Sequence, residues 1–324
     1  DTAPDGSVPG RVNERGWLAA GVPGTLGGMQ LAIELFGTKS TGDLLAPAIS
    51  LARGGVPLSE GTVRAIEANR DIALGVKIRY TDGLVGEGDQ ARAALAAAIE
   101  AAERSGTWLM VHIGYTPEPI GDVLARLRPG DVITHSYTPN PGGVVSDTSL
   151  ELSSAAVEAR SAGIEFDIGH GQGSFGWGAA RAALDAGFPP DYISSDLHRG
   201  CVNGPAFDLP SVMTKFWKLG MPIEDIVRRC TLAPARKLGI DAGTLRPGAV
   251  ADIAVLTVDD GPVRLIDCVG EEMMWDRKLR AAYTFRAGER LDPVKLGPSE
   301  DVFVDVSSLP RPSRLDPVVW PNQR

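Results

Sequence analysis

The feature that most constrains the fold is a regular alternation of short apolar runs with Ala-rich helical stretches, which begins near Asp71. Strand-length apolar runs separated by helical patterns of about 10–15 residues are typical of βαβ units and predict a parallel sheet. We predict five strands, with cores near 74–79, 109–114, 131–136, 164–169 and 192–197.

Single polar residues interrupt four of these apolar runs: Lys77, His112, His135 and Asp196. Side chains alternate between the two faces of a strand, so Lys77 shares a face with Arg79, opposite the apolar residues of the same strand. In a (β/α)₈ barrel the functional residues lie at the carboxyl ends of the strands, where these polar residues fall. We therefore expect several ionisable side chains to face a common interior.

Composition narrows the classes of partner. The formal net charge of −9 over 324 residues argues against nucleic acid, since phosphate binding requires clustered Lys and Arg. No apolar stretch approaches the ~20 residues of a membrane span. Three widely spaced cysteines indicate reduced thiols in a cytoplasmic protein. The sequence starts at Asp1 without Met or a signal-peptide pattern, which we interpret as a truncated, processed or incomplete reading frame.

The strand-borne polar residues and three later motifs resemble the amidohydrolase superfamily, in particular its deacetylase and aminoacylase-like branch. The motifs are Phe166–Phe175, Gly204–Pro210 and the pair Thr231–Arg236 with Gly243–Ile253. The resemblance covers about 70–290. It implies an α/β fold: the C-terminal five-strand part of a (β/α)₈ TIM barrel with part of a small β-sandwich, preceded by a short helical segment. We place the domains at 1–66, 67–240 and 241–291, with a Pro-rich tail at 292–324.

The resemblance also implies a metal site. Lys77 would be carboxylated by CO₂ to a carbamate that ligates metal, and its alternative is an ion pair with Asp167 or Asp196. His112 and His135 would be imidazole ligands, which suit Zn²⁺. Asp196 would touch the metal and act as general acid and base.

Further residues follow from the same motifs. The resemblance implies a substrate-side loop in which His198, Gly204, Pro205 and Ala206 bind substrate. His170 either hydrogen-bonds substrate or positions its loop. The stripe Met213, Phe216 and Trp217 on the next helix is interpreted as core.

The first segment has a different character. The Gly/Pro-rich turn Gly21–Met29 leads into helical patterns at Gln30–Phe36 and Asp43–Arg53. The amino-acid sequence from Gly21 to Ser59 resembles the large subunit of γ-glutamyltranspeptidases. The sequence context of their Thr nucleophile is absent, so we interpret the turn at 21–28 as a helix entry.

The chain departs from the amidohydrolase pattern at one point. A His-x-His pair, supplied by the family's first barrel strand, is missing, because the four histidines are His112, His135, His170 and His198. Three functions are therefore weighed: a metal-dependent C–N hydrolase, a non-catalytic remnant or chimera, and γ-glutamyl transfer. We expect a small-molecule substrate and no nucleic-acid or membrane partner, and we leave self-association open.

Overall fold

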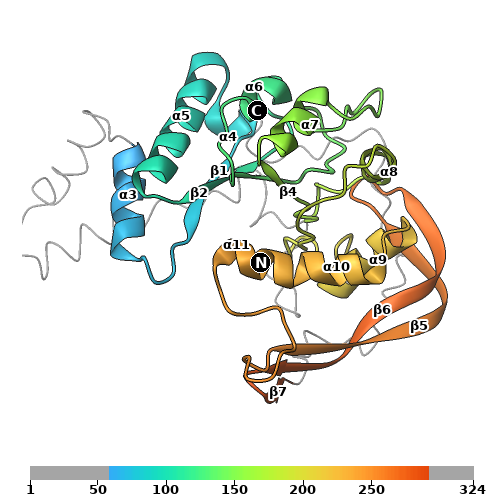
Figure 1. Cartoon of the computed structure of the whole chain (residues 1–324). Helices are drawn as coiled ribbons and strands as arrows, with labels where there is room; N and C mark the ends of the chain where they lie inside the picture. Colours follow the sequence, from blue (N-terminus) through green and yellow to red (C-terminus); the bar gives the residue numbers. More distant parts are fainter. Residues whose placement is uncertain (1–57, 292–324) are drawn as a thin grey trace, which may run out of the picture. The chain divides into compact units, whose positions relative to one another are not determined.

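The computed structural model describes residues 58–291 (Figure 1). The predicted tail at 292–324 and the helices predicted at 30–36 and 43–53 lie outside these residues, and the predicted segment 1–66 overlaps them only from Leu58. The elements are α3 Leu58–Ala68, β1 Gly75–Arg79, α4 Asp82–Val85, α5 Gly88–Arg104, β2 Trp108–His112, α6 Ile120–Leu124, β3 Val132–Thr134, α7 Ser154–Ser161, β4 Glu165–Asp167, α8 Trp177–Asp185, α9 Leu209–Lys218, α10 Ile223–Cys230, α11 Leu232–Leu238, β5 Ile253–Ile266, β6 Glu272–Arg286 and β7 Glu289–Leu291.

A parallel sheet organises the first part of the described chain. Its strand order is β1-β2-β3-β4, each strand is joined to the next through helices, and the register pairs Arg79 with His112 and His112 with Thr134. The parallel α/β architecture predicted from the alternating pattern is thus confirmed. Because the carboxyl ends of parallel strands meet at one edge of a sheet, this register brings the predicted site residues together.

The fifth predicted strand, 192–197, is reduced to a single parallel bridge between Asp167 and Tyr192. The chain still runs beside β4, since the amide of His170 donates to the carbonyl of Ser194. It leaves the extended conformation at Asp196, whose φ is 42°. Within residues 58–291 the parallel sheet therefore has four strands and a partial fifth, and these strands do not close into a barrel.

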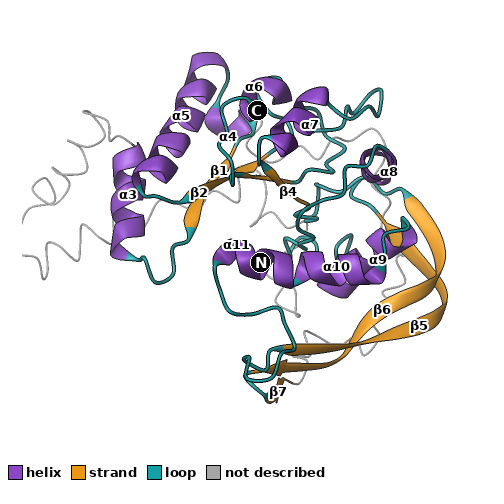
Figure 2. Cartoon of the chain, in the orientation of Figure 1, coloured by secondary structure: helices purple, strands orange, loops and turns teal. Residues whose placement is uncertain are grey.

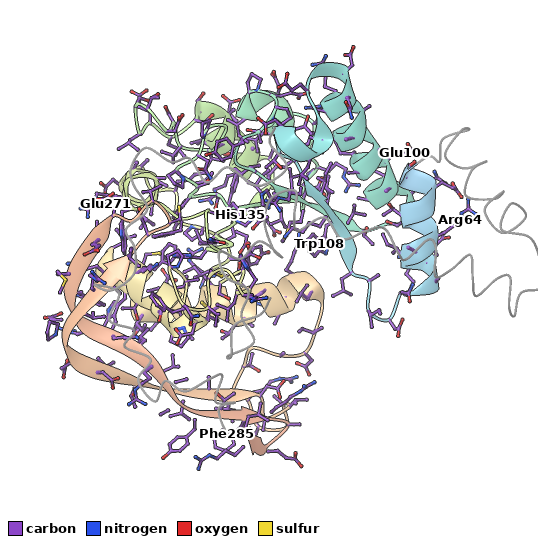
Figure 3. The ribbon with its side chains drawn as sticks, turned by 180° about the vertical axis from the view of Figure 1, so that it is seen from behind. Arg64, Glu100, Trp108, His135, Glu271 and Phe285 are labelled. Carbon is purple, nitrogen blue, oxygen red and sulfur yellow. The ribbon has the colours of Figure 1, made fainter. Side chains whose placement is uncertain are left out.

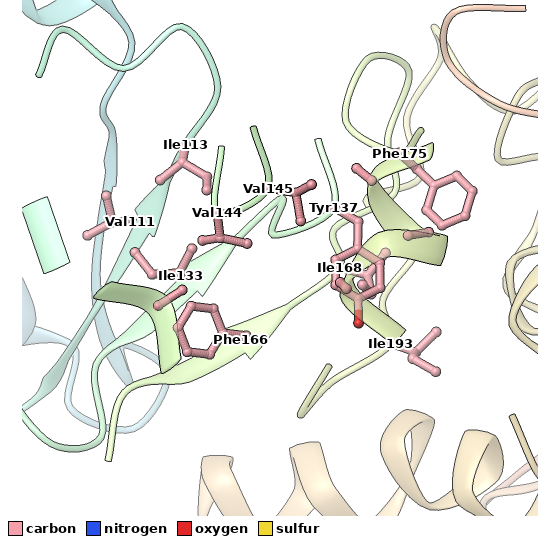
Figure 4. Close-up of a cluster of buried hydrophobic side chains, with 14 of the residues drawn as sticks. Val111, Ile113, Ile133, Tyr137, Val144, Val145, Phe166, Ile168, Phe175 and Ile193 are labelled. Atoms are coloured by element: carbon pink, nitrogen blue, oxygen red, sulfur yellow. The ribbon is translucent and has the colours of Figure 1, made fainter. Parts of the chain in front are cut away.

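Packing on both faces follows from alternation along the strands. In β2, Leu109 and Val111 have no exposed surface, while Met110 and His112 on the other face are half-buried. A buried carboxylate, Asp131, ties β2 to the loop before β3 by accepting from the amide of Leu109 at 2.8 Å. Figure 4 shows the apolar cluster that the strands and their loops form.

The helix α9 completes this core. Met213 is 4% exposed and Phe216 is fully buried, which confirms that the apolar stripe of this helix is core. Trp217 is partly buried and stands edge-on to Trp275 of β6, with ring centroids 4.9 Å apart. The helix is thus covered on two sides, by the parallel-sheet region and by the second sheet.

The second sheet is antiparallel, with the order β5-β6-β7 (Figure 2). It falls within the predicted sandwich portion, 241–291, and forms one three-stranded layer. It is fastened to the rest of the chain by backbone amides: Trp177 donates to the Asp267 carboxylate at 3.1 Å, and Leu279 donates to the Thr214 hydroxyl at 3.0 Å. None of the helices between 58 and 291 has the length and hydropathy required to cross a membrane.

Candidate functional site

Two predicted ligands meet at the carboxyl ends of neighbouring strands. His112 is the last residue of β2 and His135 directly follows β3. The His135 Nε2 lies 2.7 Å from the His112 Nδ1, and the ring planes are 79° apart. Figure 3 marks His135 in the interior of this region, viewed from behind. The sequence prediction that these two imidazoles converge is therefore matched by the geometry.

Hydrogen bonds fix the protonation of the pair. The His135 Nδ1 is 2.6 Å from the carbonyl oxygen of Gly169, which can only accept, so Nδ1 carries the proton and Nε2 presents a lone pair. The His112 Nδ1 must then donate to that lone pair. Burial, reinforced by His135, lowers the pKa of His112 to about 2. Burial also lowers the pKa of His135 to about 4, against the effect of the Gly169 carbonyl. Both rings are neutral at pH 7, the form that binds metal.

Lys77 lies on β1 at the open side of the sheet. Its side chain is exposed, on the same face as Arg79, as strand alternation predicted. Its charge lowers the pKa of both histidines, which places it in their electrostatic field. Among the residues 58–291 it has no ion-pair partner within 4.0 Å, so neither Asp167 nor Asp196 is paired with it directly.

Asp196 is exposed and held in a left-handed conformation, with φ 42°. His135 shares this rare backbone state, with φ 70°. Non-glycine residues adopt it at some cost, and such strain is concentrated at functional sites. The negative charge of Asp196 raises the pKa of His135, so the carboxylate acts on the imidazole pair electrostatically.

Two glycines let the chain approach these residues closely. A Cβ at Gly169, where φ is 46°, would lie 2.4 Å from the Thr134 hydroxyl and 2.8 Å from the His135 Nδ1. A Cβ at Gly171, where φ is 51°, would lie 2.8 Å from the Asp196 Oδ2. The loop after β4 therefore lies against one predicted ligand at each glycine, and only glycine fits at these two positions.

His170 lies between these glycines in the loop after β4. It is fully buried, stacks on Phe175 with ring centroids 4.8 Å apart, and donates from Nδ1 to the Gly171 carbonyl at 2.9 Å. Its Nε2 is 2.7 Å from the Nζ of Lys215. Both ring nitrogens thus have protein partners, an arrangement that favours the loop-positioning alternative. A direct contact with substrate stays a prediction.

The other predicted substrate residues lie in the loop after Asp196. His198 is exposed, and its Nδ1 accepts from the amide of Gly200 at 3.0 Å. Gly204 and Pro205 are half-buried, Ala206 is buried, and the Pro205 carbonyl accepts from Lys215 at 2.9 Å. A Cβ at Gly200 would meet the Gln172 side chain at 2.4 Å, so this loop lies against the loop after β4. Substrate binding by these residues stays a prediction.

Sequence reasoning gave two buried ionisable groups too little weight. Asp167 was considered only as a partner for Lys77, but it is nearly fully buried and accepts from Thr134 at 2.6 Å and from Ser194 at 3.0 Å. Burial raises its pKa, against those two hydrogen bonds. Lys215 was not singled out at all. No pattern within its helix signals this burial, because Lys215 follows Thr214 and precedes Phe216.

The donor set was tested for its fit to a divalent cation. Zn–N bonds of about 2.0–2.1 Å at a tetrahedral centre put two nitrogens about 3.3 Å apart, slightly beyond the 2.7 Å between His135 and His112. The His135 N–H bond to the Gly169 carbonyl is the outer-shell contact usual for metal-binding histidine. To hold a cation in place of their hydrogen bond, the two nitrogens would have to separate by about 0.6 Å. No cluster of three or more His, Cys, Asp or Glu residues suited to a metal occurs in the described part of the chain.

Comparison with known proteins agrees with this fold. The amidohydrolase family model matches residues 88–289, well over half of the chain, so the chain belongs to the amidohydrolase family. The crystal structure of an adenine deaminase superposes with a TM-score of 0.68 at 30% identity, covering 72% of this chain and 64% of that one. A dihydroorotase structure gives 0.63 at 28% identity, covering 71% and 62%.

Curated relatives extend the match. A protein named deacetylase from Enterococcus faecalis is 31% identical over 231 residues, covering 71% of this chain and 62% of its own length. A deacetylase from Brucella anthropi is 30% identical over 226 residues, covering 69% and 55%. The chain thus spans only about three fifths of the length of these relatives.

The N-terminal resemblance is also found. The γ-glutamyltranspeptidase family model matches residues 2–85. A glutathione hydrolase proenzyme from Pseudomonas sp. is 48% identical over 59 residues, which is 18% of this chain and 10% of that protein. The family-model match at residues 2–85 extends beyond the predicted boundary at 66 and includes β1, which is paired in the parallel sheet.

Proposed function

We propose that this chain is a metal-dependent amidohydrolase that removes an acyl group from a small N-acyl compound, as a deacetylase does. The observation that carries the proposal is the 2.7 Å approach of the neutral imidazole nitrogens of His112 and His135. The family match and the deacetylase names of two relatives support the same class of reaction.

His112 and His135 would hold the cation through the two facing nitrogens, once His112 Nδ1 has released its proton and Nε2 has taken one up from solvent. The Gly169 carbonyl would keep the His135 ring in its ligating tautomer. Bound there, a cation such as Zn²⁺ would supply Lewis acidity, polarising the scissile carbonyl and making water more acidic. Lys77 would add an oxygen ligand after its neutral amine combines with CO₂ and releases a proton, which yields a carbamate anion. Its exposed position beside the pair leaves the amine accessible to CO₂.

Asp196 would perform the proton transfers. Its carboxylate is exposed and makes no ion pair among residues 58–291, so it would be free to accept a proton from the attacking water. It would then deliver that proton to the leaving nitrogen, so the amine departs neutral and the carboxylate is restored.

Replacing Asp196 by Asn tests this role. The amide keeps the size of the side chain but cannot accept the proton, so kcat for hydrolysis of N-acetyl amino acids should fall about 10²–10⁴-fold. Metal content per chain is measured in parallel by elemental mass spectrometry. Asp147→Asn, an exposed carboxylate in a distant loop, is the control. An unchanged rate in Asp196→Asn would refute the assignment.

One observation favours a second candidate, a non-catalytic chain. The sheet is open, and no third His, Cys, Asp or Glu ligand joins the histidine pair in the part of the chain that is described. Absence of tightly held metal together with absence of turnover on every N-acyl substrate would support this candidate. Either one or two bound ions with turnover above a chelator-treated control would exclude it.

A further inference from the structure

The buried lysine of α9 is held by three acceptors from three separate segments. Lys215 is 1% exposed, and its Nζ lies 2.7 Å from the His170 Nε2, 2.9 Å from the Pro205 carbonyl and 2.6 Å from the Ile266 carbonyl. An ammonium has three hydrogens and no acceptor site, so this set matches the charged form with no donor left over. We propose that Lys215 is a positioning residue that fixes the place of Asp196 through His170 and Gly171.

The first link runs through the imidazole of His170. Since an ammonium only donates, it holds Nε2 as the acceptor and leaves the ring proton on Nδ1. That proton is donated to the Gly171 carbonyl at 2.9 Å. Stacking on Phe175, with ring planes 14° apart, keeps the imidazole in this orientation. Lys215 thereby selects the tautomer of His170 that can donate a hydrogen bond to the Gly171 carbonyl.

The second link joins Gly171 to the carboxylate. The amide of Gly171 donates to the Ser195 carbonyl at 3.0 Å, one residue before Asp196. The absent side chain of Gly171 leaves a space in which the Asp196 Oδ2 lies, 2.8 Å from where a Cβ would be. A shift of the Gly171 peptide therefore moves both the backbone before Asp196 and the surface against which its carboxylate rests.

Lys215 also donates a hydrogen bond to the loop that follows Asp196. The Pro205 carbonyl belongs to the loop that begins at Asp196 and ends at α9. Lys215 thus fixes this loop at both ends, at Asp196 through His170 and at Pro205 directly. Burying the lysine charge would be costly without these bonds, and because the three acceptors come from three separate segments, the lysine joins those segments to one another.

The inference rests on the proposed function for its catalytic readout, so the test includes two readouts that do not depend on activity. The first is the tautomer of His170 in the wild-type protein at pH 6, where Lys215 is an ammonium, read from ¹⁵N spectra of the imidazoles, of which the chain has four. Nδ1 should be protonated and Nε2 unprotonated. A proton on Nε2 would overturn the proposal without any variant being made.

The second readout is amide hydrogen exchange at His170 and Gly171 in Lys215→Met, which keeps the apolar stem and removes the donor. Both amides should exchange at least ten-fold faster than in the wild type, and metal content should be unchanged. In the catalytic assay kcat should fall on the order of 10–100-fold, with a smaller change in KM, because the general base is displaced while the histidine pair is intact. Lys218→Met, on the same helix and outside the network, is the matched control.

These outcomes separate the two proposals. If the wild type hydrolyses no N-acyl substrate, the proposed function fails, while the tautomer and exchange data still decide the role of Lys215. Unchanged exchange and unchanged kcat in Lys215→Met would refute the positioning role. If that variant does not fold, Gly171→Ala replaces it: kcat should fall with metal retained, whereas Gly173→Ala, whose Cβ meets no atom within 4 Å, should behave as wild type. Equal rates in the two glycine variants would overturn the link to Asp196.

Discussion

A single methyl group added at Gly169 should uncouple the histidine pair from its support. The glycine has φ 46°, and its carbonyl holds the His135 Nδ1 at 2.6 Å. An alanine Cβ would lie 2.8 Å from that nitrogen and 2.4 Å from the Thr134 hydroxyl, so either the peptide or the imidazole must move. The left-handed backbone costs an L-residue about 1–2 kcal/mol, and the lost hydrogen bond about 1 kcal/mol more.

We therefore expect Gly169→Ala to lower the free energy of unfolding by about 2–3 kcal/mol, measured by urea denaturation of the metal-free protein. Zn²⁺ affinity, measured by competition with a chromophoric chelator, should fall roughly 10–100-fold, as is usual when an outer-shell contact of a ligating histidine is removed. Gly173→Ala, in the same loop but with open space around its Cβ, should match the wild type in both assays. A Gly169→Ala protein with wild-type stability and wild-type Zn²⁺ affinity would refute this account of the site.

Two further outcomes test the supporting structure. Asp131→Asn should lower the free energy of unfolding by about 2–3 kcal/mol. The reason is that the buried carboxylate accepts from the amides of Leu109 and Arg128 at 2.8 Å and from the Arg128 guanidinium. Asp147→Asn is the control, and equal urea midpoints for the two variants would contradict this prediction. Burial lowers the pKa of Lys215 to about 7 from 10.5, so above pH 7 the unfolded chain binds a proton that the folded chain has lost, and stability rises with pH by at most about 1.4 kcal/mol per unit. The stability of wild type relative to Lys215→Met should therefore increase between pH 7 and pH 9, and parallel pH profiles would show that the lysine has its ordinary pKa when folded.

The alternation of polar and apolar residues along the strands predicted more of this site than the amino-acid composition of the chain did. Alternation along β1 and β2 correctly placed Lys77 and His112 on the face opposite the buried Val76 and Val111, because side-chain direction in a strand is a local property. The meeting of His112 and His135 also followed, since parallel strands one unit apart end at the same edge. The fifth predicted strand was only partly right, because Asp196 adopts a left-handed backbone conformation that ends the extended segment.

The network of Lys215 could not be predicted in the same way. On a helix with the stripe Met213 and Phe216, helical periodicity places Lys215 away from the apolar side, where solvent is expected. The β5–β6 sheet covers that side, and the acceptor it contributes, the Ile266 carbonyl, is more than fifty residues away in the chain. Such a contact exists only after the second sheet has packed, so no pattern within the helix reports it. His170 was recognised as a loop residue, but its partner was hidden for the same reason.

The fastening of β5–β6 to the parallel-sheet region bears on how the molecule comes apart. The hairpin supplies the Asp267 carboxylate that accepts from the first amide of α8, and the carbonyl that completes the shell of Lys215. If the hairpin detached, a helix end would lose its acceptor and a buried cation would face an unfilled cavity. We therefore expect the second sheet to unfold together with the helices it covers, in one melting transition. Detachment of the hairpin would also release the loop that bears Asp196, because that loop is held by the same lysine.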